Sequence, residues 1–389
     1  MRTRMFRVMI GLVAFAAALF SAGSGPATAG PNPILAYRVL ELGSLGGSVG
    51  SSQSVNDRGL VAGWSNLLGN TARHATLWDG TRAVDLGTLG GENSSIVWPV
   101  KNVEGRLAGI AQTSTTDPLH ERWSCAAFIA ATGQECRGFV WEGNRMWPLP
   151  TLGGNNGFAA GMNDLGQITG WAETPVHDPT CQGNDQVLQF LPVIYGPGRT
   201  QIRALPLLSG DSSGAATAIN DHGQAVGISG LCDQAVGRLT ARHAVLWSNG
   251  TVTNLGDLGA GWWNTPTAIN DNRDVVGFAG DPGDIEGNVT HAFIWTSEHG
   301  MQRLIPGEDN SVAYGINDLG QVVGTECTLD NSSCSGFVWQ NGHLTRINDA
   351  APGFAGTITV ATDINDDGVI TGRAATAIGR VAIEAIPAT

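Results

Sequence analysis

The chain has 389 residues, of which 55 are glycine and only 14% are charged, whereas an average soluble domain has about 25% charged residues. Hydrophobic residues make up 42% of the chain, which is enough to bury a core and excludes a disordered polypeptide. The formal net charge of −13 argues against partners that are bound through a phosphate backbone, so we expect no nucleic-acid partner.

The first 29 residues have the three parts of a secretory signal peptide. They are the basic residues Arg2, Arg4 and Arg7, the apolar run from Val8 to Phe20, and the small-residue cleavage site Ala27-Thr28-Ala29. No later segment reaches the length of about 18 consecutive apolar residues that a membrane span requires. We therefore expect Sec-type export with cleavage near Ala29, a secreted extracellular or periplasmic monomer of bacterial type, and a single domain over residues 30–389.

An Asn-Asp-x-Gly element that precedes an apolar pair and a glycine recurs along the chain. Clear copies begin at Asn56, Asn163, Asn220, Asn317 and Asn365, and weaker copies begin at Asn102 and Asn270. A second element, His-Ala-Phe-Ile-Trp or a near copy, also occurs seven times. Six copies end in an aromatic residue, at Trp78, Trp141, Tyr195, Trp247, Trp295 and Trp339, and the last copy ends in Glu384. A third, Leu-Gly-x-Leu-Gly-Gly, covers residues 42–47, 86–91 and, with one change, 149–154.

Successive copies of the first element are 46 to 61 residues apart, a period typical of propeller blades with four short strands. Asn, Asp and Gly accept positive φ, so each Asn-Asp-x-Gly run is expected to close a hairpin between strands A and B of one unit. Strand C is then the His-Ala-Phe-Ile-Trp element, and strand D ends at Leu-Gly. We predict an all-β, seven-bladed propeller of four-stranded antiparallel blades.

The two ends of the predicted domain complete one another. The segment 37–43 resembles a strand D without its partners, and the segment 380–386 is a strand C without a strand D. Pairing of these two segments would close the ring and remove exposed strand edges.

These three phrases resemble those of the HAF family of probable extracellular repeat proteins, from about Tyr37 to the end of the chain. The resemblance implies an exported bacterial protein and transfers no catalytic residues. The fourth and last units depart from the pattern, with Tyr195 and Glu384 at the tryptophan position.

The strand order places all long insertions in loops between strands B and C, on one face of the ring. These loops cover residues 111–136, 171–189, 228–242, 278–290 and 325–335, and they contain all six cysteines. An exported chain with an even number of cysteines is expected to form disulfides. The loop positions suggest the pairs Cys125 with Cys136, Cys181 with Cys232, and Cys327 with Cys334. We expect no metal site, because no Cys-x-x-Cys and His spacing supports one.

Long loops on a rigid scaffold commonly carry binding sites. Six tryptophans lie in or beside these loops, namely Trp64, Trp98, Trp123, Trp171, Trp262 and Trp263. Their rings could stack on sugar rings or anchor a protein partner, or they could fill gaps between blades. They are our candidate ligand-binding residues.

The leading hypothesis is a non-enzymatic binding module without a cofactor, whose partner is a glycan or an extracellular protein. One alternative is a polysaccharide hydrolase or lyase, and a hydrolase would need two acids about 5 to 9.5 Å apart. The loop face offers the acids Glu173, Asp178, Asp211, Asp281, Asp284 and Glu286, with no spacing that pairs them and no predicted catalytic residue. Another alternative is a structural component of an envelope or matrix, which predicts no deep pocket.

Overall fold

The structure is a computed structural model that describes residues 36–181, 185–232, 241–284, 287–307 and 310–388. The predicted signal peptide, residues 1–29, lies outside these ranges. Short helical segments occur at η1 (Leu68–Asn70), α1 (Trp123–Ala126) and α3 (Ile347–Ala350). Within the described ranges, no helix has the length and apolar character needed to cross a membrane.

Five of the sheets contain four antiparallel strands each, and the strands follow one another in space as they do in sequence. They are β6 (Gly90–Ser95), β7 (Leu107–Thr116), β8 (Gln134–Glu142) and β9 (Arg145–Pro148); β10 (Gly157–Met162), β11 (Ile168–His177), β12 (Leu188–Tyr195) and β13 (Ile202–Ala204); β14 (Ser213–Ile219), β15 (Ala225–Gly230), β16 (His243–Ser248) and β17 (Thr251–Asn254); β18 (Thr265–Ile269), β19 (Val275–Gly280), β20 (Thr290–Thr296) and β21 (Gly300–Arg303); β22 (Asn310–Ile316), β23 (Val322–Cys327), β24 (Cys334–Gln340) and β25 (His343–Arg346). The predicted A-B-C-D order of strands is confirmed in all five.

The remaining sheet has eight strands and joins the two ends of the chain. It contains β1 (Tyr37–Glu41), β2 (Gly46–Val55), β3 (Val61–Leu67), β4 (Arg73–Asp79), β5 (Arg82–Asp85), β26 (Thr357–Ile364), β27 (Ile370–Thr376) and β28 (Gly379–Pro387). β1 pairs antiparallel with β28, from Tyr37 opposite Pro387 to Glu41 opposite Ile383. A single parallel bridge between Val49 and Arg380 connects β2 to β28. The predicted partnership of the N-terminal and C-terminal strands is therefore present.

The turn between the first two strands of each repeat explains its sequence. In the repeat that begins at Asn317, the Gly320 amide donates to the Asn317 carbonyl, and the Gln321 amide donates to Asn317 Oδ1 at 2.9 Å. Gly320 has a φ of +73°, which glycine adopts without a steric penalty. The weak repeat at Asn270 keeps this turn although Arg273, with a φ of +70°, stands in place of the glycine.

The glycine that ends the Gln-Val-Val-Gly phrase permits close packing between the first two strands. A Cβ atom on Gly324 of β23 would lie 2.0 Å from the Val312 carbonyl oxygen of β22 and 2.7 Å from the Phe337 ring. Phe337 of β24 is fully buried and packs with residues of the preceding sheet such as Val276. The core therefore lies between neighbouring sheets, and the aromatic residue of the third strand needs the glycine beside it.

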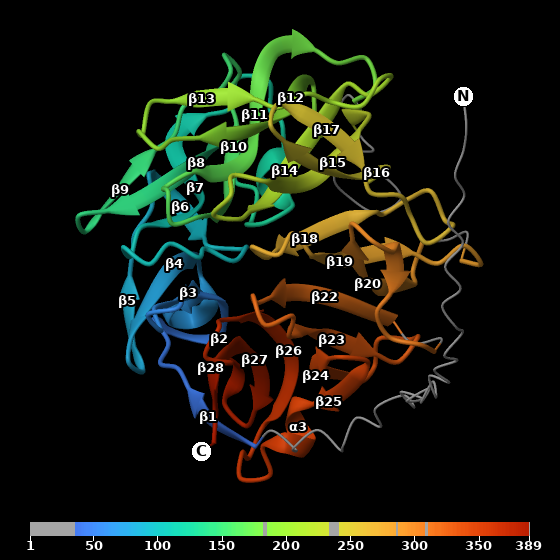
Figure 1. Cartoon of the computed structure of the whole chain (residues 1–389). Helices are drawn as coiled ribbons and strands as arrows, with labels where there is room; N and C mark the ends of the chain where they lie inside the picture. Colours follow the sequence, from blue (N-terminus) through green and yellow to red (C-terminus); the bar gives the residue numbers. More distant parts are fainter. Residues whose placement is uncertain (1–35, 182–184, 233–240, 285–286, 308–309, 389) are drawn as a thin grey trace, which may run out of the picture. The chain divides into compact units, whose positions relative to one another are not determined.

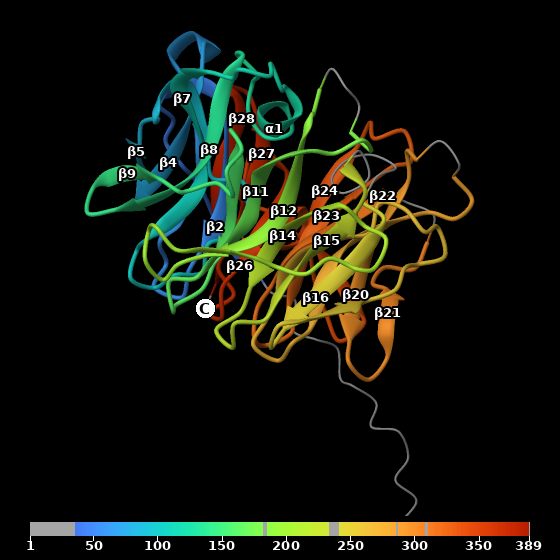
Figure 2. The ribbon, with the colours of Figure 1, turned by 90° about the horizontal axis from the view of Figure 1, so that it is seen from above.

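The sheets follow one another around a common centre, as Figures 1 and 2 show. Contacts between β4 and β6, β8 and β10, β12 and β14, β16 and β18, β20 and β22, and β24 and β26 join each sheet to the next. The first strand of each repeat lies nearest the centre. The space at the centre has two ends. We call the end that carries the Asn-Asp-x-Gly turns the turn end, and we call the opposite end the loop end.

Seven asparagine side chains form a continuous series of hydrogen bonds at the turn end. The Nδ2 group of each donates to the backbone carbonyl of the corresponding asparagine in the next repeat, over 2.8 to 3.1 Å. The series runs through Asn56, Asn102, Asn163, Asn220, Asn270, Asn317 and Asn365, and the last bond returns to Asn56. Each Oδ1 accepts the amide four residues later in its own turn. Asparagine is needed here because one side chain must both accept within a repeat and donate to the next.

Replacing Asn317 by alanine tests this series. The substitution removes the bond to the Asn365 carbonyl, which keeps only the Gly368 amide as a donor, and leaves the buried Gln321 amide without its acceptor. We expect a loss of about 1–3 kcal/mol in the free energy of unfolding, measured by chemical denaturation. The control is Asn254→Ala, which removes an exposed turn bond to the Gly256 amide and should cost about 0.5 kcal/mol or less. Equal losses in the two variants would contradict a special role for the series.

Candidate functional site

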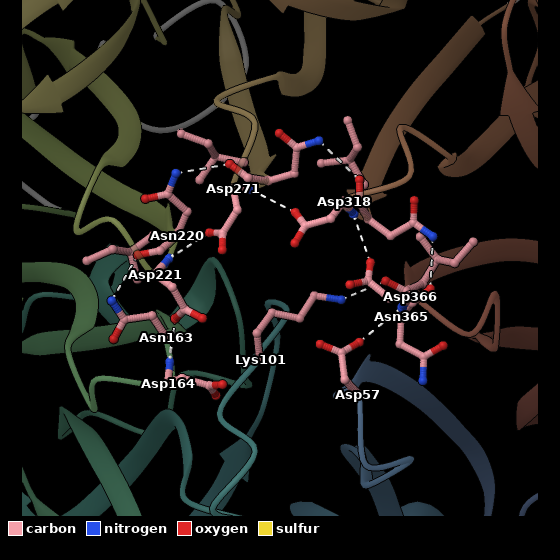
Figure 3. A pocket seen from close by; sticks show the side chains of 16 residues that line it. Asp57, Lys101, Asn163, Asp164, Asn220, Asp221, Asp271, Asp318, Asn365 and Asp366 are labelled. Atoms are coloured by element: carbon pink, nitrogen blue, oxygen red, sulfur yellow. Dashed lines mark hydrogen bonds between the residues drawn. The ribbon is translucent and has the colours of Figure 1, made fainter.

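A hollow at the turn end is surrounded by six carboxylates, shown in Figure 3. They belong to Asp57, Asp164, Asp221, Asp271, Asp318 and Asp366. We call this space, of about 70 Å³, the aspartate hollow. One oxygen of each carboxylate accepts the backbone amide of the equivalent residue in the preceding repeat, with Val103 taking the place of an aspartate in the second repeat. The carboxylates are therefore part of the same connection between repeats as the asparagines.

Lys101 extends into the aspartate hollow. Its Nζ lies 2.7 Å from Asp363 Oδ1 and 2.7 Å from the Ile364 carbonyl oxygen. Asp363 is fully buried, and its other oxygen accepts the Val55 amide. Burial raises the pKa of Asp363, and Lys101 opposes that rise. This ion pair joins the first, second and last repeats, so the single lysine of the chain has a structural partner.

The carboxylates of the aspartate hollow repel one another. Burial raises the pKa of Asp318 above its ordinary value, and Asp366, Asp271 and Asp57 raise it further. When the pKa of an acid is higher in the folded chain than in the unfolded chain, the unfolded chain loses its proton more easily. The free energy of unfolding therefore falls as the pH rises through the pKa of the folded chain.

We therefore expect Asp318→Asn to raise the melting temperature at neutral pH. The asparagine Oδ1 can still accept the Asp271 amide, while the repulsion disappears. The gain should shrink as the pH falls and Asp318 of the parent protein becomes protonated. Thermal unfolding of both proteins between neutral and acidic pH measures this difference. A gain that is the same at every pH would show that the charge of Asp318 is not its source.

The loop end of the centre contains a cavity of about 450 Å³ with aromatic walls, which we call the aromatic pocket. Its rings belong to Trp98, Phe128, Phe158, Trp171, Trp263 and Phe278. The Phe158 and Trp171 rings are buried, and the other four rings are partly exposed. The size and the apolar lining are those of small-molecule sites in proteins.

The aromatic rings of this pocket brace one another. Phe128 stacks on Phe158 with 4.3 Å between ring centroids and an interplanar angle of 7°. Trp98 meets both rings edge to face, at 5.8 and 6.1 Å. On the other side, Trp263 meets Phe278 edge to face at 5.9 Å. The orientation of the exposed rings is thus set before any ligand arrives.

Phe128 comes from the long insertion between β7 and β8, and several contacts hold that loop in place. The Cys125–Cys136 disulfide closes it, and Arg73 Nη1 donates to the Phe128 carbonyl at 3.0 Å. Farther along the loop, Glu121 Oε1 accepts the amides of Val187 and Leu188 from the next insertion. The insertions of two neighbouring sheets are therefore joined to each other.

A second cavity, of about 190 Å³, adjoins the aromatic pocket through Trp98, which lines both. We call it the arginine pocket. Its polar lining residues are Ser51, Gln53, Thr267, Tyr314, Thr362 and Arg373. Together the two pockets take residues from strands β2, β10, β14, β18, β22 and β26 and from segment 97–99. The central opening is therefore aromatic on one side and polar on the other.

Three of the six tryptophans predicted from sequence, Trp98, Trp171 and Trp263, line the aromatic pocket. Trp262 does not appear in its lining and packs on Gly280 instead. Trp64 is buried, with the Arg73 guanidinium 3.7 Å above its ring. Trp123 begins α1, and its side chain is outside the described part of the structure.

The three disulfides predicted from the loop positions are present. They join Cys125 to Cys136, Cys181 to Cys232, and Cys327 to Cys334, with Cα separations of 5.7, 4.8 and 4.1 Å. The bond between Cys181 and Cys232 connects the insertions of two consecutive sheets. In the described ranges, the one group of side chains close enough to share a metal ion consists of these two cysteines and Asp178. The cysteines are bonded to each other, so this group is not a metal site.

The acids that a hydrolase would need do not line the described parts of either pocket. Instead they accept hydrogen bonds that hold the loops: Glu173 from the amides of Asn155 and Asn156, Asp178 from Ser212 and Ser213, Asp211 from Ser229, and Asp284 from the Val289 amide. Asp281 pairs with His291 at 2.6 Å. Glu286 lies outside the described residues.

Sequence reasoning did not find the three phenylalanines of the aromatic pocket, nor Tyr314 and Arg373. Phe158 and Tyr314 belong to the first strands of their repeats, β10 and β22, which the predicted strand order places next to the centre. That position was an available signal. Phe128 had none, because its place depends on how the insertion folds back.

The comparisons with known proteins bear on the fold. No family model matches the sequence, and no curated protein matches it. Among solved structures, the chain is similar to an oligogalacturonate lyase in complex with manganese, with 11% identity, a TM-score of 0.52 and coverage of 91% of this chain and 96% of that one. It is also similar to the β-propeller domain of the Trilobed protease from Pyrococcus furiosus, with 10% identity, a TM-score of 0.51 and coverage of 87% and 95%. A streptogramin B lyase has 11% identity, a TM-score of 0.50 and coverage of 91% and 98%. At such low identity these likenesses concern the fold alone, and they show a β-propeller scaffold.

Proposed function

We propose that the protein is an exported, non-enzymatic β-propeller of the HAF type that binds a glycan in the aromatic pocket. The observation that carries this proposal is a cavity of about 450 Å³ at the loop end whose partly exposed walls are the rings of Trp98, Phe128, Trp263 and Phe278. The C–H faces of a sugar ring can stack on such preset aromatic planes. Because the rings already contact one another, the ligand pays little to order them.

The proposed scaffold has seven blades. In this interpretation the eight-stranded sheet consists of two blades, one made of β2 to β5 and the other of β26 to β28 with β1 as its outer strand. Two observations support it. The sequence elements occur seven times, and the asparagine series contains seven bonds and returns to its first member.

A glycan fits the site better than a protein partner does. A stable protein interface buries about 800 Å² on each partner, and it is typically spread over a broad surface rather than sunk into a cavity. The pockets found here are concave and joined at Trp98. One side offers aromatic planes, and the other offers the hydroxyl and amide groups of Tyr314, Thr362 and Gln53. A short saccharide presents both kinds of surface.

Export of the protein is supported by its cysteines. Three disulfides are typical of proteins that fold in an oxidising compartment, such as the periplasm or the extracellular space. We propose that residues 1–29 direct the chain there.

A polysaccharide lyase is the second candidate function, and Tyr314 beside Arg373 in the arginine pocket is the observation that favours it. Elimination from a uronic acid needs a cation at the carboxylate and a base for the proton next to it. Burial raises the pKa of Tyr314, so its phenol stays protonated at neutral pH and is a poor base. Ultraviolet absorbance from an unsaturated sugar, on incubation with acidic polysaccharides, would favour the lyase over a binding module.

The binding site can be tested with single tryptophan substitutions. In a glycan-array screen followed by titration calorimetry, Trp98→Ala and Trp263→Ala should each weaken binding of the selected glycan about five- to thirtyfold, because each removes a stacking surface worth about 1–2 kcal/mol. The control is Trp147→Ala, since Trp147 stacks with Arg145 and Arg199 away from either pocket. Binding that persists in both pocket variants, or no binding by the folded parent protein, would overturn the proposal.

A further inference from the structure

Arg373 occupies an unusual position on β27. Its side chain lines the arginine pocket together with Tyr314, Gln53 and Thr362, and Trp98 connects this pocket to the aromatic pocket. A ligand that stacks against Trp98 therefore reaches the surroundings of the guanidinium with its next group.

The guanidinium of Arg373 has no ion-pair or hydrogen-bond partner among the residues that the structure describes. Other arginines do find carboxylates: Arg106 lies 3.0 Å from Glu142, Arg137 lies 3.2 Å from Glu135, and Arg346 pairs with Glu326. The chain has 34 acidic residues and 21 lysines and arginines, so carboxylates are in surplus. Several exposed arginines also lack a carboxylate partner, but Arg373 differs from them because it is partly buried and lines a pocket.

The surroundings of Arg373 make this charge costly to leave unpaired. Burial lowers the pKa of Arg373, Tyr314 opposes this shift, and the nearby charge of Arg380 adds to it. A partly buried cation without a counter-charge loses hydration and gains nothing in return. A bound anion would restore that balance, whereas a neutral sugar would not.

We infer that Arg373 binds an acidic group of the ligand, so that the glycan recognised here carries a carboxylate or sulfate beside the sugar ring that stacks on Trp98. This inference rests on the proposed function and names the class of glycan. The planar guanidinium can donate two parallel hydrogen bonds to either anion. The protonated phenol of Tyr314 and the amide of Gln53 line the same pocket and supply further polar contacts.

The mature wild-type protein provides the first arm of the test. Its affinity is measured by calorimetry for a short oligogalacturonate, for the methyl ester of the same oligosaccharide, and for a sulfated and a neutral oligosaccharide. We expect binding of at least one acidic probe to exceed that of the neutral and esterified probes at least about tenfold, which is about 1.4 kcal/mol. The comparison of the two acidic probes distinguishes carboxylate from sulfate.

The second arm uses variants. Arg373→Met should lower the affinity for the acidic probe at least about tenfold and leave the weak binding of the neutral probe unchanged. Arg373→Lys keeps the charge but loses the planar fork, so it should recover only part of the affinity. The control is Arg203→Met, which removes an exposed positive charge on β13 that neither pocket contains. Thermal unfolding of each variant establishes that it is folded, and the esterified probe tests the charge without any substitution.

The outcomes separate the two proposals. Binding of neutral glycans with equal or higher affinity, or an Arg373→Met affinity equal to that of Arg203→Met, would overturn the acidic class while leaving glycan binding intact. Absence of binding to every glycan, by a folded protein, would overturn the proposed function itself.

Discussion

The structure depends on a side chain that does two things at once. In every repeat, the asparagine at the turn accepts an amide within its own hairpin and donates to the carbonyl of the next repeat. The local turn and the spacing between sheets are thereby set by one residue. Because the last bond returns to Asn56, each repeat is held from both sides. Buried side chains of the third strands, such as Phe139, Phe293 and Phe337 beside their glycines, fill the space between these sheets.

This arrangement gives the two ends of the centre different tasks. At the turn end, the carboxylates that face the aspartate hollow also accept backbone amides, and the one lysine pairs with Asp363. These polar groups are used in holding the repeats together. At the loop end, acidic side chains accept hydrogen bonds that hold the loops. The pockets at this end are lined by aromatic rings and by Arg373. The loop end therefore combines aromatic surfaces with a cationic side chain.

Much of the fold follows from patterns that repeat. The strand order, the hairpin at Asn-Asp-x-Gly, the pairing of β1 with β28 and the three disulfides could be predicted because each depends on local turn chemistry or on equivalent positions in successive units. Trp98 and Trp263 could be proposed because they lie beside loops. Trp64 could not be separated from them by sequence, since its burial depends on Arg73 folding over its ring. Phe128 and Arg373 have no counterparts in the other repeats, so the repeat pattern does not identify them. Phe128 reaches its pocket through the fold of an insertion, and Arg373 lines its pocket from β27. The asparagine bonds between repeats were also not predicted, although the recurrence of asparagine rather than aspartate at the first turn position was the signal.

The central claim is that the ligand lies at the loop end, between Trp98 and Arg373. A crystal structure of the mature protein grown with the acidic oligosaccharide that binds most tightly tests it most directly. The claim predicts a sugar ring stacked in the aromatic pocket with its acidic group within hydrogen-bonding distance of the Arg373 guanidinium. A ligand bound on the outer strands or at the aspartate hollow, with the aromatic pocket empty, would contradict it.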